Sequence, residues 1–539
     1  MEIRNKSVYP KSCDGFPLKT IYRFLNVHVR TISFLSGSVF ISLWALLRFF
    51  ETGSTYDLLG QQLLTRQWLS GNMSHAVVGT TNYLWKMLIF YAPTDILPGS
   101  PRIKLIVLTI LINILTFILL VLVLEKLCTE IGIKVSSYFY AGLIWLTLIA
   151  GSVFWVQFTN SRNLEVVGGV YLIYLGIKLI HKLTTKLAVG TLLLASILFF
   201  SDPIQVYMTA VPLLIYAYVQ SYSTKVNIQR PAWLTAILSI AYLASKVITL
   251  AATHIFSLQF TRAPGLATIT TYSLSSWFHN ILDTGKSFIQ LYDGGHELGR
   301  VVQLLDLLLV GLSIIYFIIW ALKKRSLRKV MWLVSIVFVI DAVVYMASGQ
   351  SYTGGTSRYL IMTVPMLIII FGAVGTLRLL RVFLALAVFA IFINGLVLTS
   401  TTIKAWGTRF TGDQHLVSAV KYLNQQRYPY AYASMDTAIP TSYYYNPRTT
   451  VLPLSCFNGV LARAYLFYGK EVFIKAESTP TSLVPIILDG GSIRNYPNTC
   501  TKYDVIKQFG NPAGIQSTSY GDEVLLYAPS STLAALGSR

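Results

Sequence analysis

Long apolar runs recur between residues 31 and 400 of this 539-residue chain. A helix needs roughly 20 predominantly apolar residues to cross the hydrocarbon core of a bilayer. Only 12% of the residues are charged and the mean hydropathy is +0.59, whereas soluble domains carry about twice that charge. The sequence therefore predicts a polytopic α-helical membrane protein. About 11 transmembrane helices are expected, near residues 31–50, 103–127, 137–157, 163–181, 186–201, 203–220, 231–252, 301–321, 329–348, 358–374 and 382–400.

Basic residues are distributed unevenly along the chain, whose net charge is +21. They stand in short clusters between the apolar runs, without the basic face and interleaved aromatic residues of a nucleic-acid binder. With residues 1–30 placed in the cytoplasm, Lys and Arg concentrate in the inner segments, as the positive-inside rule requires. We therefore expect a multi-pass protein of the cell membrane, with no nucleic-acid partner. Its N-terminal segment is cytoplasmic and its first apolar run is a signal anchor.

Two loops on the expected outer side, residues 51–102 and 253–300, are too long to be simple connections. Within the first loop, residues 80–97 are apolar, but Lys86 and Pro93 interrupt them. We expect an interfacial helix there rather than a further span.

The tail beyond the last apolar run has a mixed pattern of its own. The chain is thus divided into a transmembrane domain at residues 31–400 and a small extracytoplasmic α/β domain at residues 401–539, which is long enough for a core of its own. Helices are expected at residues 413–426 and 502–509, and strands at residues 430–434, 450–454, 472–476, 483–488 and 523–527.

Four cysteines are present, and two of them, Cys456 and Cys500, fall in the outer tail. These two can form a disulfide on the oxidising side of a membrane, or remain as two buried thiols. No His or Cys cluster has the spacing of a metal site, and no Walker-type loop is found.

Ionisable residues within or beside membrane spans are costly and commonly mark function or a paired structural contact. In this chain they lie on the outer side of the midplane, which indicates a site open to the outer leaflet rather than a transmembrane conduit. The residues in question are Glu51, Asp57, Glu165, Asp202, Lys246, Asp306, Asp341 and Arg358.

Structural roles stay open for several of these residues. Asp57 can be the N-cap of the amphipathic run 58–69, and Asp202 can simply end a helix before Pro203. Lys246 and Asp341 can form a structural ion pair.

Three short motifs and their order carry a resemblance to a known family. An acidic segment, Glu51-Thr-Gly-Ser-Thr-Tyr-Asp57, follows the first span, and Asn160-Ser-Arg-Asn-Leu-Glu165 follows the third. Arg358-Tyr359 opens a late span, and a soluble tail lies outside. In layout the chain resembles the GT-C superfamily of polyprenyl-phosphate-sugar-dependent glycosyltransferases, which includes protein mannosyltransferases and the lipid A aminoarabinose transferase. The adjacent acidic pair of protein mannosyltransferases is missing, so the acceptor class is not carried over.

The resemblance implies transfer of a sugar from a polyprenyl phosphate to an acceptor hydroxyl, with inversion. Asp57 would be the general base, and Glu165 would orient the acceptor or a cation. The leaving phosphate would be held by cations. The substrate-binding set implied is Arg358 first, then Lys86, Arg162 and Lys246, with Glu51 and Asp202 beside them.

Partners and alternatives are left open by the sequence. The acceptor can be a glycan, a lipid or a protein, and some members of the superfamily need a divalent metal whereas others do not. Two other classes fit a membrane protein of this kind: a polysaccharide polymerase or ligase of another fold, and a non-enzymatic flippase or transporter of lipid-linked sugars.

Overall fold

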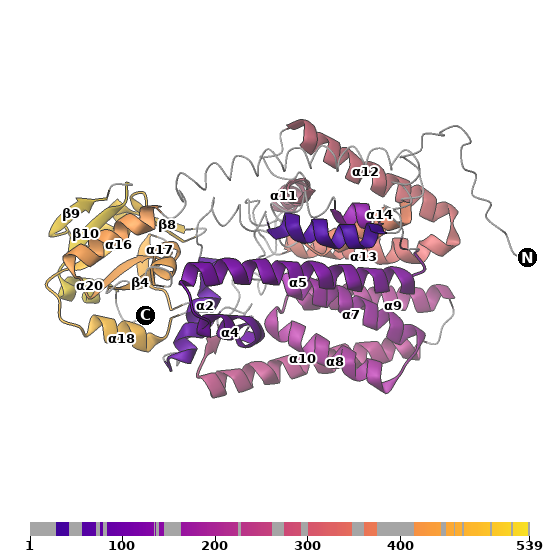
Figure 1. The fold of residues 1–539 in the computed structure, drawn as a ribbon, viewed down its shortest axis with the longest axis horizontal. Coiled ribbons are helices and arrows are strands. Elements are labelled where there is room, and N and C mark those ends of the chain that lie inside the picture. The colour runs from indigo at the N-terminus through magenta and orange to yellow at the C-terminus, as the bar shows by residue number, and fades with distance from the viewer. Residues whose placement is uncertain are drawn as a thin grey trace, which may run out of the picture.

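The protein is elongated, with a bundle of long helices at one end and an α/β tail at the other (Figure 1). The computed structural model describes residues 28–42, 56–71, 76–78, 84–133, 135, 139–144, 163–224, 228–260, 274–292, 300–347, 360–374, 414–442, 449–457, 459–465, 468–495, 498–518 and 521–536.

Helices of the bundle follow the apolar runs closely. Four described helices are long and apolar enough to cross a membrane, in the spans Ile103–Glu130, Leu164–His181, Gln229–Phe256 and Leu327–Met346. The helices are α5 (Pro101–Glu130), α7 (Asn163–His181), α8 (Thr185–Ser201), α9 (Val211–Thr224), α10 (Gln229–Phe256), α12 (Arg300–Lys323), α13 (Arg325–Ala347) and α14 (Thr363–Val374).

The outward faces of these helices are apolar as well. On α10, Leu243, Val247 and Leu250 are each more than half exposed. Exposed apolar side chains on helices long and apolar enough to cross a membrane are typical of a surface that faces lipid, so the chain is a membrane protein. The expected total of about 11 spans stays a prediction, because residues 382–400 and most of 137–157 lie outside the described part of the chain.

Helix α7 is packed closely between its neighbours because of two glycines. A Cβ added to Gly168 would come within 2.7 Å of Leu198 on α8, and one added to Gly176 within 2.4 Å of Leu213 on α9. Small residues at such positions let membrane helices approach closely. The start of α7 is thereby fixed against the end of α8.

The two long loops that were expected on the outer side are joined to each other by a short pair of strands. Strand β1 (Val77–Val78) pairs in parallel with β2 (Gln259–Phe260). The first loop contains α2 (Tyr56–Leu69), α3 (Leu84–Lys86), the π-helical turn η1 (Met87–Tyr91) and α4 (Ala92–Ile96), and the second contains α11 (Leu274–Tyr292).

The tail contains a six-stranded sheet in the order β5-β4-β3-β6-β10-β9, in which β3 pairs in parallel with β4 and β6. Its described strands are β3 (Tyr430–Ser434), β4 (Thr450–Phe457), β5 (Val460–Arg463), β6 (Val484–Leu488), β9 (Gly514–Ser517) and β10 (Glu523–Tyr527), with a separate pair β7 (Ser492–Asn495) and β8 (Asn498–Thr501). Its helices are α16 (Gln414–Gln426), α17 (Met435–Pro440), α18 (Lys470–Glu477), α19 (Lys502–Phe509) and α20 (Pro529–Leu536).

One expected strand of the tail is wrong. Residues 472–476 belong to helix α18, in which Phe473 and Ala476 are buried while Ile474 is 56% exposed. The buried positions are three apart, as on one face of a helix, and they meet the tail core. The β-branched composition of the run suggested a strand, and tertiary packing overrode it.

A disulfide joins Cys456 of β4 to Cys500 of β8. Of the two alternatives that the sequence left open, the structure therefore shows the bonded form.

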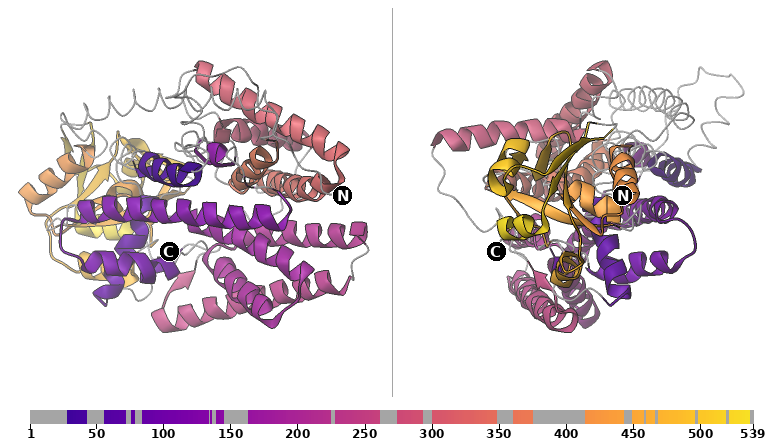
Figure 2. Two further views of the ribbon diagram at one scale, coloured as in Figure 1. Left: turned by 45° about the vertical axis from the view of Figure 1, so that its right-hand side comes forward. Right: turned by 90° about the vertical axis from the view of Figure 1, so that its left-hand side faces the viewer.

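The tail rests directly on the bundle. Its main hydrophobic core includes Leu63 of α2 and Leu105 of α5, and α17 packs on α2. The rotated views show the same arrangement, with the tail against the end of the bundle where α5 begins (Figure 2).

Candidate active site

A buried ion pair lies at the tail end of the bundle. Lys86, at the end of α3, places its Nζ 2.5 Å from Oε2 of Glu165, in the first turn of α7. The side chains are only 2% and 0% exposed, respectively. The sequence singled out both residues separately, and the fold brings them together.

Two further side chains hold Glu165 in place. The Trp85 indole Nε1 donates to Oγ of Ser201 at 2.9 Å and to Oε1 of Glu165 at 3.3 Å. The Ser201 hydroxyl donates to the same Oε1 at 2.8 Å. Glu165 thus accepts hydrogen bonds at both oxygens, which is how a buried carboxylate is kept in one orientation.

Asp202 lies directly after Ser201 and is 0% exposed. It is the C-cap residue of α8, so the interpretation of this residue as a helix end is confirmed. Its position next to Ser201 places a second carboxylate at the same end of the bundle.

An ion pair of this kind is expensive to bury. Removing two charges from water costs several kcal/mol per ion in real proteins, and the mutual attraction offsets this only with good geometry and additional hydrogen bonds. Membrane proteins keep such groups mainly at functional sites. The network of Lys86, Glu165, Trp85 and Ser201, hereafter the Lys86 cluster, is therefore the candidate active site.

Two other ionisable residues do not join this cluster. Lys246 lies on the exposed face of α10, with its Nζ 5.0 Å from the centre of the Tyr242 ring. Asp341 of α13 is 0% exposed, and among the described residues neither of its carboxylate oxygens has a hydrogen-bond partner. The ion pair of Lys246 with Asp341 is therefore wrong: one side chain faces outward and the other inward.

The remaining sequence candidates fall wholly or partly outside the described residues. Glu51, Arg162 and Arg358 are among these. For Asp57 the backbone is described: α2 begins at Tyr56, so Asp57 stands in its first turn. The interpretation of Asp57 as the N-cap is therefore wrong, because the helix already includes Tyr56.

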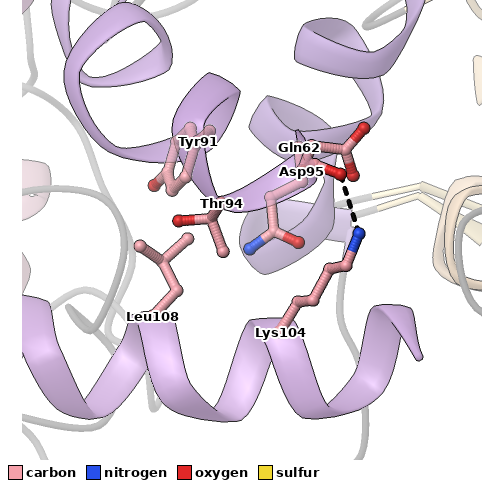
Figure 3. A pocket seen from close by; sticks show the side chains of 6 residues that line it. All are labelled: Gln62, Tyr91, Thr94, Asp95, Lys104 and Leu108. Carbon is pink, nitrogen blue, oxygen red and sulfur yellow. Dashed lines mark hydrogen bonds between the residues drawn. The ribbon is translucent and has the colours of Figure 1, made fainter. Parts of the chain in front are cut away.

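A small cavity lies between α2, η1, α4 and α5 and is lined by Gln62, Tyr91, Thr94, Asp95, Lys104 and Leu108 (Figure 3). Lys104 Nζ donates to the Asp95 backbone carbonyl at 2.7 Å, and Arg66 Nη2 lies 3.5 Å from Asp95 Oδ1. The cavity volume is only ≈ 10 Å³, which is room for about one water molecule. The Lys104–Asp95 hydrogen bond therefore fastens α4 to α5, and the Arg66–Asp95 contact joins α2 to α4.

Trp85 and Ser201 were missed by sequence reasoning. The chain has ten Trp residues and no spacing distinguishes Trp85 from the others. Its direct position before Lys86 is the one signal that could have drawn attention to it.

The residues of the Lys86 cluster include a single carboxylate, that of Glu165. Within the described ranges, no three His, Cys, Asp or Glu side chains come together in a way that could hold a metal ion. Lys86 also occupies the position beside Glu165 that a cation would take.

Comparison with known proteins gives a match at the level of the fold. The crystal structure of ArnT from Cupriavidus metallidurans, bound to undecaprenyl phosphate, is similar with a TM-score of 0.51 and 10% sequence identity, over 94% of this chain and 99% of that one. No protein-family model matches the sequence, and no curated protein matches it. At 10% identity this likeness is one of overall fold, and this chain shares that fold with ArnT over nearly its whole length.

Proposed function

We propose that this protein is a membrane glycosyltransferase that moves a sugar from a polyprenyl-phosphate donor to an acceptor hydroxyl. The observation that carries the proposal is the buried Lys86–Glu165 pair in a fold shared with ArnT. Fold likeness alone does not determine function. The Lys86 cluster supports the proposal independently, because it places a buried lysine and a buried glutamate at the end of the bundle next to the tail.

The charge of the cluster limits what Lys86 can do alone. Glu165 neutralises Lys86, so the pair has a net charge near zero, and an incoming phosphate requires additional positive charge. Arg358 is our first choice for that second cation, with Arg162 next. Lys246, on the outward face of α10, is not part of this set, and Glu165 acts as the residue that orients Lys86.

Asp57 is proposed as the general base. An inverting transfer needs one carboxylate that accepts the proton of the acceptor hydroxyl on the face opposite the leaving phosphate. Asp57 lies in the first turn of α2, the helix that touches both the tail and the neighbouring helix α4. Glu51 and Asp202 complete the acidic surroundings in which the acceptor would be bound.

The site is proposed to face the extracytoplasmic side, with residues 1–30 in the cytoplasm and the tail outside. The polyprenyl chain would lie against the apolar outer face of the bundle. The tail disulfide between Cys456 and Cys500 supports an oxidising compartment for that end. Lipid, glycan and protein acceptors all remain compatible with the site.

The test is a transfer reaction with the full chain reconstituted in liposomes. A radiolabelled sugar on undecaprenyl phosphate is supplied, with and without lipid, glycan and protein fractions of the source envelope. We expect release of undecaprenyl phosphate only when an acceptor fraction is present. Movement of intact donor between leaflets without such release would show a flippase and refute the proposal.

A further inference from the structure

One end of the tail sheet extends toward the bundle. In the parallel pairing of β3 with β4, Ser434 is the partner of Leu454, and β4 continues to Phe457. These three further residues add about 10 Å at roughly 3.3 Å per residue. Beyond Ser434 the chain enters α17, which packs on α2. Strand β4, strand β8 and α17 are accordingly seen on the side of the tail next to the bundle (Figure 1).

Large apolar side chains are exposed at this end. Phe457 is 58% exposed, Val460 47% and Tyr503 73%. Phe457 and Val460 are directly paired across the β4–β5 hairpin, and the first turn of α19, which holds Tyr503, lies against that hairpin. These three residues are called the hairpin end.

The hairpin end is rigidly supported from behind. The disulfide of Cys456 with Cys500 fastens the last turn of the hairpin to β8. Thr501 and Asp504 form a capping box that starts α19. Apolar side chains that lie together and exposed on well-supported backbone are typical of an interaction surface.

The position of the tail relative to the membrane spans indicates which partner lies against the hairpin end. Leu105 belongs to the tail core and also lies within the apolar span Ile103–Glu130. The underside of the tail therefore reaches the first turn of a membrane span, which is the level of the lipid headgroups. Aromatic side chains are favoured at that level because their rings are apolar and their edges can be polar.

We propose that the hairpin end is immersed in the interfacial region of the bilayer, in the leaflet on the tail side. The partner is phospholipid, and the contact holds the tail at a fixed height and tilt above the bundle. Phe457 and Val460 supply apolar area, and Tyr503 supplies a ring with a hydroxyl that can stay hydrated.

The experiment uses the full chain in nanodiscs of radiolabelled phosphatidylethanolamine and phosphatidylglycerol. A photoreactive benzophenone side chain replaces Phe457, Tyr503 or Ile515 in three separate preparations. Ile515 is the matched control, because it is 50% exposed on edge strand β9, on the side of the tail away from the bundle (Figure 1). Tyr503 is exposed enough to be replaced without loss of packing.

We expect lipid crosslinks at positions 457 and 503 several-fold above those at position 515. Lipid yields at 457 and 503 that equal the yield at 515 would overturn the proposal. Crosslinks to the protein's own helices in place of lipid would overturn it as well, since the hairpin end would then be a contact within the chain.

Discussion

Two ion pairs at opposite ends of the bundle share their chemistry and differ in their surroundings. At the tail end, Lys86 and Glu165 are 2% and 0% exposed. At the other end, Arg30 binds Glu125 of α5 through two hydrogen bonds of 2.9 and 2.8 Å, and these side chains are 53% and 17% exposed. Tyr140 adds a hydrogen bond to the same carboxylate.

The difference in exposure indicates different roles for the two ion pairs. An exposed pair contributes about 0–1 kcal/mol, and Arg30 with Glu125 adds to the apolar packing of residues 28–42 against Phe117 of α5. A buried pair is a poor means of stabilisation, because well-packed apolar residues commonly do as well or better. We therefore propose a role in sugar transfer for the Lys86 cluster and a structural role for the Arg30 pair.

The largest expected effect is on the rate of sugar transfer, when the proposed general base is replaced. Asp57→Asn should lower the transfer rate by about 10²- to 10⁴-fold, which is the usual contribution of a general base. Expression and membrane insertion should stay normal, because the amide has the same size. The rate is measured with the reconstituted transfer reaction. Glu125→Gln is the control and should keep the wild-type rate; an active Asp57→Asn protein would refute the assignment of the base.

The second prediction breaks the buried pair. Lys86→Met leaves Glu165 without its cation, and removing one partner of a buried pair costs about 3–5 kcal/mol. The free energy of unfolding, measured by SDS titration in mixed micelles, should fall by that amount, and donor binding should weaken. An unfolding free energy equal to that of the wild type would show that the pair is not buried in the protein interior.

The third prediction replaces both charges. In the double variant Lys86→Met with Glu165→Leu, most of the lost unfolding free energy should return, because no uncompensated charge remains in the interior. The rate of sugar transfer should stay as low as in Lys86→Met. Recovery of activity together with stability would mean that the cluster is purely structural.

The smallest effect is expected at the exposed pair. Arg30→Met should change the unfolding free energy by about 0–1 kcal/mol and leave transfer unchanged. The same SDS titration and transfer reaction measure both. A loss as large as that of Lys86→Met would remove the distinction between the two ends.

Elements governed by local pattern could be predicted from the sequence. The bounds of α7 and the strand Tyr430–Ser434 agree with the expected ranges, because a continuous apolar run of this length predicts a span and a short tyrosine-rich run predicts a strand. Residues 472–476 were predicted wrongly because a short apolar run does not distinguish a strand from a helix, and the core decides.

The site was only partly predictable for a different reason. Lys86 and Glu165 stand out individually as charges near membrane spans, but they are 79 residues apart in sequence. Their pairing depends on how the outer loop folds back over α7. Ser201 carries no signal at all in sequence, since a serine at a helix end is common; only the close approach of α7 and α8 at Gly168 brings it to Glu165.

The most direct test of the account is the affinity of the full chain for undecaprenyl phosphate in nanodiscs, compared for the wild type, Lys86→Met and Arg30→Met. We expect the wild type and Arg30→Met to bind equally well. Lys86→Met should bind at least about tenfold more weakly, a loss of about 1.4 kcal/mol. Equal affinity in all three proteins would contradict the assignment of the phosphate site to the Lys86 cluster.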